Sequence, residues 1–66
     1  MTLGTLIKTC LNIDSNTSIM IYHTLEDFEN ATPNWNSCKA ESITDSEAKI
    51  VVFQILNHNL VAVALA

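Results

Sequence analysis

The side chains of this chain that are suited to chemistry are two histidines, two cysteines and seven carboxylates. Cys10, His23, Cys38 and His58 stand far apart, and none belongs to a C-x-x-C or H-x₃-H pair. Structural zinc sites usually take their ligands in such closely spaced pairs. The spacing therefore predicts no metal site and no cofactor.

Nucleophilic catalysis has equally little support. A serine or cysteine nucleophile needs a base, and the base needs an orienting group, all within a cleft. A chain of 66 residues has little room for a ligand cleft, which usually measures about 300–1,000 Å³. Gly4 is the only glycine, so no glycine-rich loop is present to hold a phosphate. We expect a protein that binds and has no catalytic residues.

Six of the seven carboxylates gather in two short segments. A general acid would need burial to raise its pKa, whereas these segments are polar and turn-like, so the carboxylates should stay ionised. They are either solvated surface that keeps the protein soluble or an array that occupies a lysine- and arginine-lined groove, because carboxylates accept paired hydrogen bonds from arginine much as phosphates do. The predicted partner-binding residues are Glu26, Asp27, Glu29, Glu41, Asp45 and Glu47, with Trp35 and Tyr22 as anchors unless these two aromatic residues belong to the core.

The charge balance bears on the partner. Seven acidic residues face three lysines and no arginine, which gives a net charge of −4. Direct nucleic-acid binding needs cations to neutralise phosphates, so we expect none and favour a protein partner with a basic surface. The N-terminus lacks the basic start and apolar core of a signal peptide, and no apolar run approaches the ~20 residues of a membrane span. These features predict a cytoplasmic protein with reduced thiols and no membrane contact.

The elements that must position these residues follow from hydrophobic spacing. Apolar residues at 3, 6, 7, 10 and 11 predict a helix over Thr2–Leu11 with Thr2 as its N-cap. Ser18–His23 is β-branched and aromatic and predicts a strand. Thr24, with Asp27 three residues later, predicts a short helical turn.

The second half predicts three further strands. A loop over Asn30–Ser37 leads into a strand over roughly Trp35–Ser42, and a capping box at Thr44–Glu47 predicts one helical turn that ends before Ile50. A helix continuing through Leu56 is disfavoured, because Ile50–Leu56 is rich in β-branched residues.

Ile50–Leu56 and Leu60–Leu65 flank Asn57-His58-Asn59, which predicts a tight hairpin because asparagine tolerates positive φ. The last strand is apolar at every position, so it is either central in the sheet or covered by a partner, and homodimerisation through it is the alternative. The predicted fold is α+β, a single domain over residues 1–66. One N-terminal helix packs on a small, mainly antiparallel sheet of about four strands that ends in a β-hairpin.

A resemblance supplements this interpretation. The runs Lys39–Ala48, Val51–Ile55 and Leu60–Val63, with Thr2–Ile7 and Ile19–Tyr22, resemble those of short proteins encoded by phages and mobile elements of Firmicutes. The resemblance implies a bacterial host cell and no particular activity. Small acidic α/β proteins from such elements include anti-CRISPR proteins, to which this chain is similar in size and charge.

Two functional hypotheses follow. The first is a non-enzymatic anti-CRISPR inhibitor that blocks a type II RNA-guided nuclease, because such nucleases hold DNA in basic channels that an acidic, DNA-mimicking surface would occupy. The alternative is a structural or regulatory accessory protein of a mobile element, homodimeric and without a nuclease target.

Overall fold

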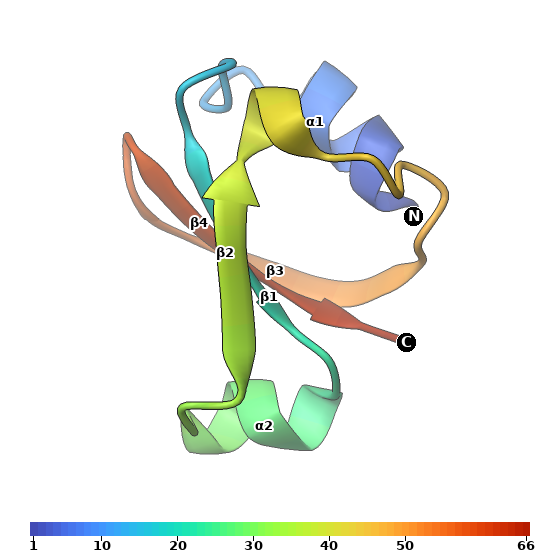
Figure 1. Cartoon of the computed structure of the whole chain (residues 1–66), viewed down its shortest axis with the longest axis vertical. Coiled ribbons are helices and arrows are strands. Elements are labelled where there is room, and N and C mark those ends of the chain that lie inside the picture. Colours follow the sequence, from blue (N-terminus) through green and yellow to red (C-terminus); the bar gives the residue numbers. More distant parts are fainter.

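The computed structural model describes residues 1–66 and confirms a small α+β fold with a four-stranded mixed sheet and a C-terminal hairpin (Figure 1). In chain order the elements are α1 (Leu3–Thr9), β1 (Ser18–Tyr22), α2 (Leu25–Asn30), β2 (Trp35–Lys39), the 3₁₀ helix η1 (Ala40–Ser42), β3 (Ile50–Asn57) and β4 (Leu60–Leu65).

The sheet has the strand order β2-β1-β4-β3. β2 pairs with β1 and β3 with β4 in antiparallel fashion, whereas β1 and β4 run parallel, with Ile19 opposite Val61 and Ile21 opposite Val63. The all-apolar strand β4 is thus central, which is the first of the two positions that its sequence allowed. Both of its edges are paired within the chain, so β4 offers no free strand edge to a second copy.

α1 covers one face of the sheet. Thr2 caps the helix, since its Oγ1 accepts the backbone N–H of Thr5 at 3.2 Å, and Leu3 and Leu6 are buried against Ile19 and the valines of β4. The helix ends at Thr9, two residues before the predicted end. Leu11 is fully exposed and Ile13 takes the core position instead, because Cys10 is already extended and turns the chain back toward the sheet.

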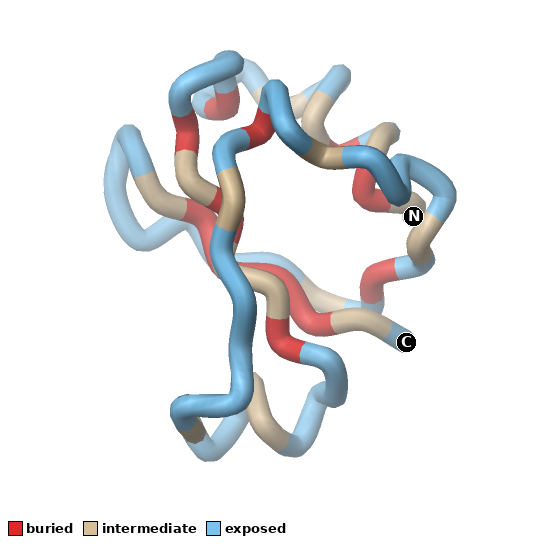
Figure 2. Tube along the Cα trace, viewed as in Figure 1, coloured by how far each residue is buried: buried red, intermediate tan, exposed pale blue.

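α2 covers the other face. Its N-cap is Thr24, as predicted, and Asp27 donates its backbone N–H to the Thr24 Oγ1 at 3.1 Å. Phe28 packs edge-on against Tyr22 with ring centroids 5.6 Å apart, and beneath this pair lie the small residues Ala62 and Ala64. Val61 and Val63 face the α1 side, so β4 is buried on both faces. Its trace contributes to the buried segments at the centre of Figure 2.

Two expectations for the middle of the chain are wrong. The strand predicted to reach Ser42 ends at Lys39 and continues as η1. The segment Thr44–Glu47 does form a short turn, in which Ala48 donates its N–H to the Asp45 carbonyl at 3.2 Å, but the turn is not helical. The reason is that other backbone groups of this segment are engaged elsewhere. The Ser46 carbonyl accepts the N–H of Gly4 at 2.7 Å, and the Ile50 N–H, which a helix would direct to Ser46, donates to the Met1 carbonyl at 2.9 Å.

The hairpin turns at His58 and Asn59 as predicted, but without positive φ. Ala31, at the C-cap of α2, is the only residue of the chain with positive φ. Asn57 instead accepts the Asn59 N–H with its side-chain oxygen at 2.8 Å, and a bulge at Leu56 adjusts the register before the turn. The side chain of Asn57 therefore supports the turn without a left-handed backbone.

Candidate functional site

The first acidic segment lies on α2. Glu26 and Glu29 are exposed and three residues apart on the helix, whereas Asp27 is half-buried. Asp27 Oδ1 accepts hydrogen bonds from Thr32 Oγ1 at 3.0 Å and from Asn34 Nδ2 at 3.4 Å, and Oδ2 accepts from Thr24 Oγ1 at 3.1 Å. Asp27 thus ties the start of α2 to the loop before β2, and both of its carboxylate oxygens already accept hydrogen bonds within the chain.

These bonds hold the pKa of the Asp27 carboxyl below its ordinary value. The largest cause is the hydrogen bond from Thr32, followed by that from Thr24, while partial desolvation opposes them and Asn34 and the charge of His23 add smaller lowering effects. Each hydrogen bond favours the ionised form, because it donates to the charged oxygen. The carboxylate is therefore a structural acceptor.

Asp27→Asn is expected to lower the thermal unfolding midpoint at neutral pH, with the gap to wild type narrowing in acid. A group with a lowered folded-state pKa adds stability above its unfolded-state pKa, near 3.9, and loses it as pH falls through the folded-state value. Thermal denaturation followed by circular dichroism at pH 7 and about pH 2 measures both gaps. Glu29→Gln on the exposed side of α2 is the control, and an equal Asp27→Asn gap at both pH values would contradict the assignment.

The second acidic segment lies on η1 and the loop that follows. Glu41, Asp45 and Glu47 are exposed. Together with Glu26 and Glu29 they make five carboxylates that accept none of the chain's side-chain hydrogen bonds. In Figure 1, α2 and η1 stand at opposite ends of the long axis, which measures 27 Å. The acidic residues of α2 therefore lie apart from those of η1 and the loop that follows it, and we call these two groups the acidic ends.

The two aromatic residues expected as anchors have different environments. Tyr22 is 7% exposed and belongs to the core beneath α2. Trp35, opposite Tyr22 at the start of β2, is 40% exposed. Of the two, Trp35 alone is placed to contact a partner.

The histidines and cysteines do not converge. No group of three His, Cys, Asp or Glu side chains is placed to hold a metal ion. Cys10 and Cys38 are free, half-buried thiols on α1's C-cap and on β2. His23 Nε2 lies 2.9 Å from Asn36 Nδ2, across the β1–β2 pair.

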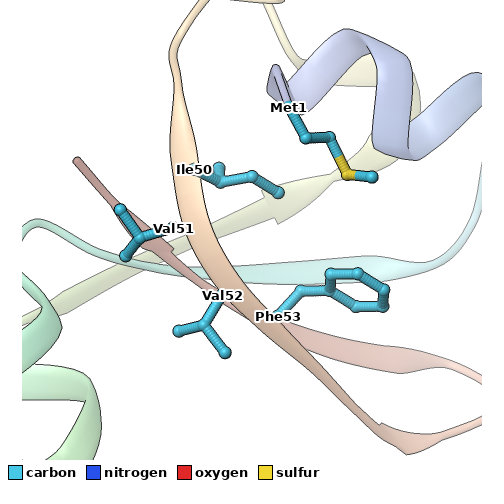
Figure 3. A pocket seen from close by; sticks show the side chains of 5 residues that line it. All are labelled: Met1, Ile50, Val51, Val52 and Phe53. Carbon is cyan, nitrogen blue, oxygen red and sulfur yellow. The ribbon is translucent and has the colours of Figure 1, made fainter.

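An exposed apolar surface that the sequence did not predict lies along β3. We define the β3 edge surface as the exposed apolar side chains Met1, Val51, Phe53, Ile55 and Leu56, which are 38–62% exposed. A hollow of about 360 Å³ at one end is lined only by hydrophobic residues from Met1 and Ile50–Phe53. Figure 3 shows Met1, Ile50 and Phe53 on one side of the β3 ribbon and Val51 and Val52 on the other. The available signal was that β3 contains no charged residue, only Gln54 and Asn57 being polar.

Comparison with known proteins found no relative of this chain. No family model matches the sequence, and neither a curated protein nor a solved structure is significantly similar to it. None of the helices is long and apolar enough to cross a membrane. The class that fold and surfaces define is a small α+β domain with two acidic ends and one apolar sheet edge.

Proposed function

We propose that this protein acts without catalysis, by binding a protein that presents basic grooves meant for nucleic acid. The observation that carries the proposal is the set of five exposed carboxylates in the two acidic ends, on α2 and on η1 with the loop that follows it. None is engaged by the rest of the chain, so each is available to arginine or lysine of a partner. Charge-assisted bonds of this kind are about twice as strong as neutral ones.

The most concrete partner is a type II RNA-guided nuclease in a bacterial host cytoplasm. Such nucleases hold the guide–target duplex in a positively charged channel and read the short flanking motif with arginines. An acidic domain seated there before DNA arrives would exclude DNA by occupancy, which is the action of an anti-CRISPR inhibitor.

The spacing of the charges limits the form of mimicry. A DNA duplex as long as the 27 Å axis of this molecule carries about 16 phosphates, against seven carboxylates in the chain. The acidic ends are therefore better suited to contact two separate basic clusters on a partner than to imitate a full row of phosphates. We propose that each end contacts its own cluster of arginine or lysine side chains.

Reversing one acidic end should test the proposal directly. Glu26→Lys with Glu29→Lys changes the charge by +4 and spares Asp27, so the fold should persist, because exposed substitutions usually cost within about 0.5 kcal/mol each. Added to the nuclease before DNA, wild-type protein should inhibit cleavage, and the reversed protein should lose most of that inhibition. Added after DNA loading, neither should inhibit. Target-DNA cleavage in both orders of addition is the measurement.

The matched control is Glu41→Lys with Glu47→Lys, which changes the charge by the same +4 at the other end. An unequal loss of inhibition between the two variants would locate the contact. An equal loss of inhibition that is no longer seen at high salt would indicate long-range attraction, since exposed charges are screened beyond ~8 Å at physiological ionic strength. If both variants inhibit like wild type, the carboxylates are solvated surface. If wild type neither binds nor inhibits at micromolar concentration, the nuclease is not the partner.

The second candidate function, a homodimeric structural or regulatory accessory protein, is favoured by a different observation. The β3 edge surface exposes large apolar side chains beside an unpaired strand edge, and such patches usually mark a protein interface. The accessory protein would use this surface and would leave the acidic ends in solvent.

A further inference from the structure

β3 is an edge strand that is only partly covered. On its outer side, Thr2 bridges to Lys49 and Ile50 donates its N–H to the Met1 carbonyl at 2.9 Å. Beyond Ile50, no backbone group of β3 is bonded to anything on that side. The pairing begun by Met1 and Thr2 therefore stops where the apolar run starts, and an open strand edge remains from Val51 to Asn57.

The two edges of the sheet differ in how they are protected. β2, at the other edge, is five residues long, presents Asn36 and Ser37 to solvent and ends at Lys39. Short length, polar residues and lysine are the usual means of blocking edge-to-edge association. β3 has eight residues and no charge. Only β3 thus presents an edge on which another strand is readily added.

The sequence of β3 is self-complementary about Gln54. An antiparallel copy centred on that residue places Phe53 opposite Ile55 twice and Val52 opposite Leu56 twice, with the two Gln54 side chains meeting at the axis. Aromatic and β-branched residues are favourable cross-strand partners. In this register Leu56 and Asn57 of one copy lie over the outer edge at Val51–Val52 of the other, at the hollow lined by Met1 and Ile50–Phe53.

We propose that the chain forms a two-fold dimer in which the outer edges of β3 from two copies pair antiparallel and centre on Gln54. The two sheets then join into one eight-stranded sheet. A contact of a surface with itself closes after two copies, so it produces a dimer and not a filament. The surface differs from the one predicted from sequence, since β4 is central and β3 is the strand left open.

Exposure and charge are consistent with a second copy as the occupant. The β3 edge surface presents five large apolar side chains that are 38–62% exposed. They lie beside the unpaired strand edge from Val51 to Asn57. β3 carries no charge, and the acidic residues lie on α2, η1 and adjoining loops. The net charge of −4 per copy is thus kept away from the contact.

The two bulges of β3 define how far the pairing extends. They lie at Val51 and Leu56, and between them Val52–Ile55 keeps a regular register with β4. Bulges bend and twist a strand, so in a pairing centred on Gln54 the regular part is Phe53–Ile55, and Val52 and Leu56 pair at its margins. Gln54 is exposed and lies on the α2 side of the sheet, opposite Ala62, which makes it the position to test.

Gln54→Lys should separate the copies without affecting the fold, because it places two lysines directly opposite each other at the axis. Sedimentation equilibrium at 1–100 µM should give twice the chain mass of 7.3 kDa for wild type. For the variant it should give the single mass, with a dissociation constant raised about a hundredfold by the like-charge contact. Ser37→Lys, the same charge change on exposed β2, is the matched control and should remain dimeric.

Mixing variants tests the register. Gln54→Lys and Gln54→Glu should each be monomeric alone and should form a one-to-one dimer when mixed, because only the mixed pair places opposite charges at the axis. Amide hydrogen exchange on wild type should show protection of Val52–Leu56 that rises with concentration, with no such rise for β2. A wild type that sediments at 7.3 kDa throughout, or a Gln54→Lys variant that remains dimeric, overturns the proposal. The proposal is independent of the nuclease hypothesis, since cleavage inhibition plays no part in these measurements.

Discussion

Ile19→Ala is expected to destabilise the fold by about 2–5 kcal/mol, the usual cost of cutting a buried isoleucine to alanine. Ile19 is fully buried and lies at the centre of the sheet, opposite Cys38 on one side and Val61 on the other. α1 closes over it with Leu3 and Leu6. Because a domain of this size has a total stability of about 3–10 kcal/mol, the variant should be largely unfolded at 37 °C.

Urea denaturation followed by far-UV circular dichroism measures this effect. Ile19→Val is the graded control, with an expected loss of about 0.5–1.5 kcal/mol. Leu11→Ala removes a leucine that is fully exposed and should change the stability by no more than about 0.5 kcal/mol. Equal urea midpoints for Ile19→Ala and Leu11→Ala would mean that the core does not centre on β1.

The sequence was sufficient for those elements that local pattern determines. The stripe of Leu3, Leu6 and Ile7 predicted α1, the Thr24–Asp27 pair predicted the start of α2, and the apolar runs around His58 predicted the hairpin. Each depends on residues within a few positions of one another. These predictions agree with the structure because cap hydrogen bonds and hairpin pairing join residues that are close together in the sequence.

Non-local contacts decided the rest. Nothing near Leu60–Leu65 indicates that β4 runs parallel to β1, which is joined to it through α2, β2, η1 and β3. The Thr44–Glu47 segment has a capping pattern, yet its Ser46 carbonyl accepts the N–H of Gly4, which lies more than forty residues away in the sequence. Competition from distant partners is the usual way in which tertiary structure overrides propensity.

The candidate site shows the same division. Exposure of Glu26, Glu29 and the second acidic segment followed from their polar surroundings, whereas the engagement of Asp27 depends on Thr32 and Asn34, which reach it from the next loop. The apolar face of β3 could not be assigned before the strand order was known, because the same residues would be core in a central strand. Only the placement of β4 inside the sheet leaves β3 at the edge.

Gly4 suits its position through its lack of a side chain and not through backbone freedom, since it has no positive φ. It lies in the first turn of α1, where its N–H donates to the Ser46 carbonyl at 2.7 Å. A Cβ at this position would lie 2.9 Å from that same carbonyl oxygen and 2.8 Å from the Ser46 Cβ. These atoms are backbone or, like the Ser46 Cβ, fixed directly to it, so no flexible side-chain end can move aside to relieve the contact.

Gly4→Ala is therefore expected to lower stability, although alanine is the better helix former. The helix preference favours the variant by about 1 kcal/mol, while forcing a methyl group into a closed contact costs about 1–3 kcal/mol. The clash should prevail, because relieving it moves α1 off the Ser46–Ile50 segment and strains the hydrogen bonds of Leu3 and Gly4 to that segment. Urea midpoints measure the balance, with Lys8→Ala on the exposed side of the same helix as control. A Gly4→Ala protein as stable as wild type would show that α1 can shift away from the segment at no cost, and the close approach would then contribute nothing to the fold.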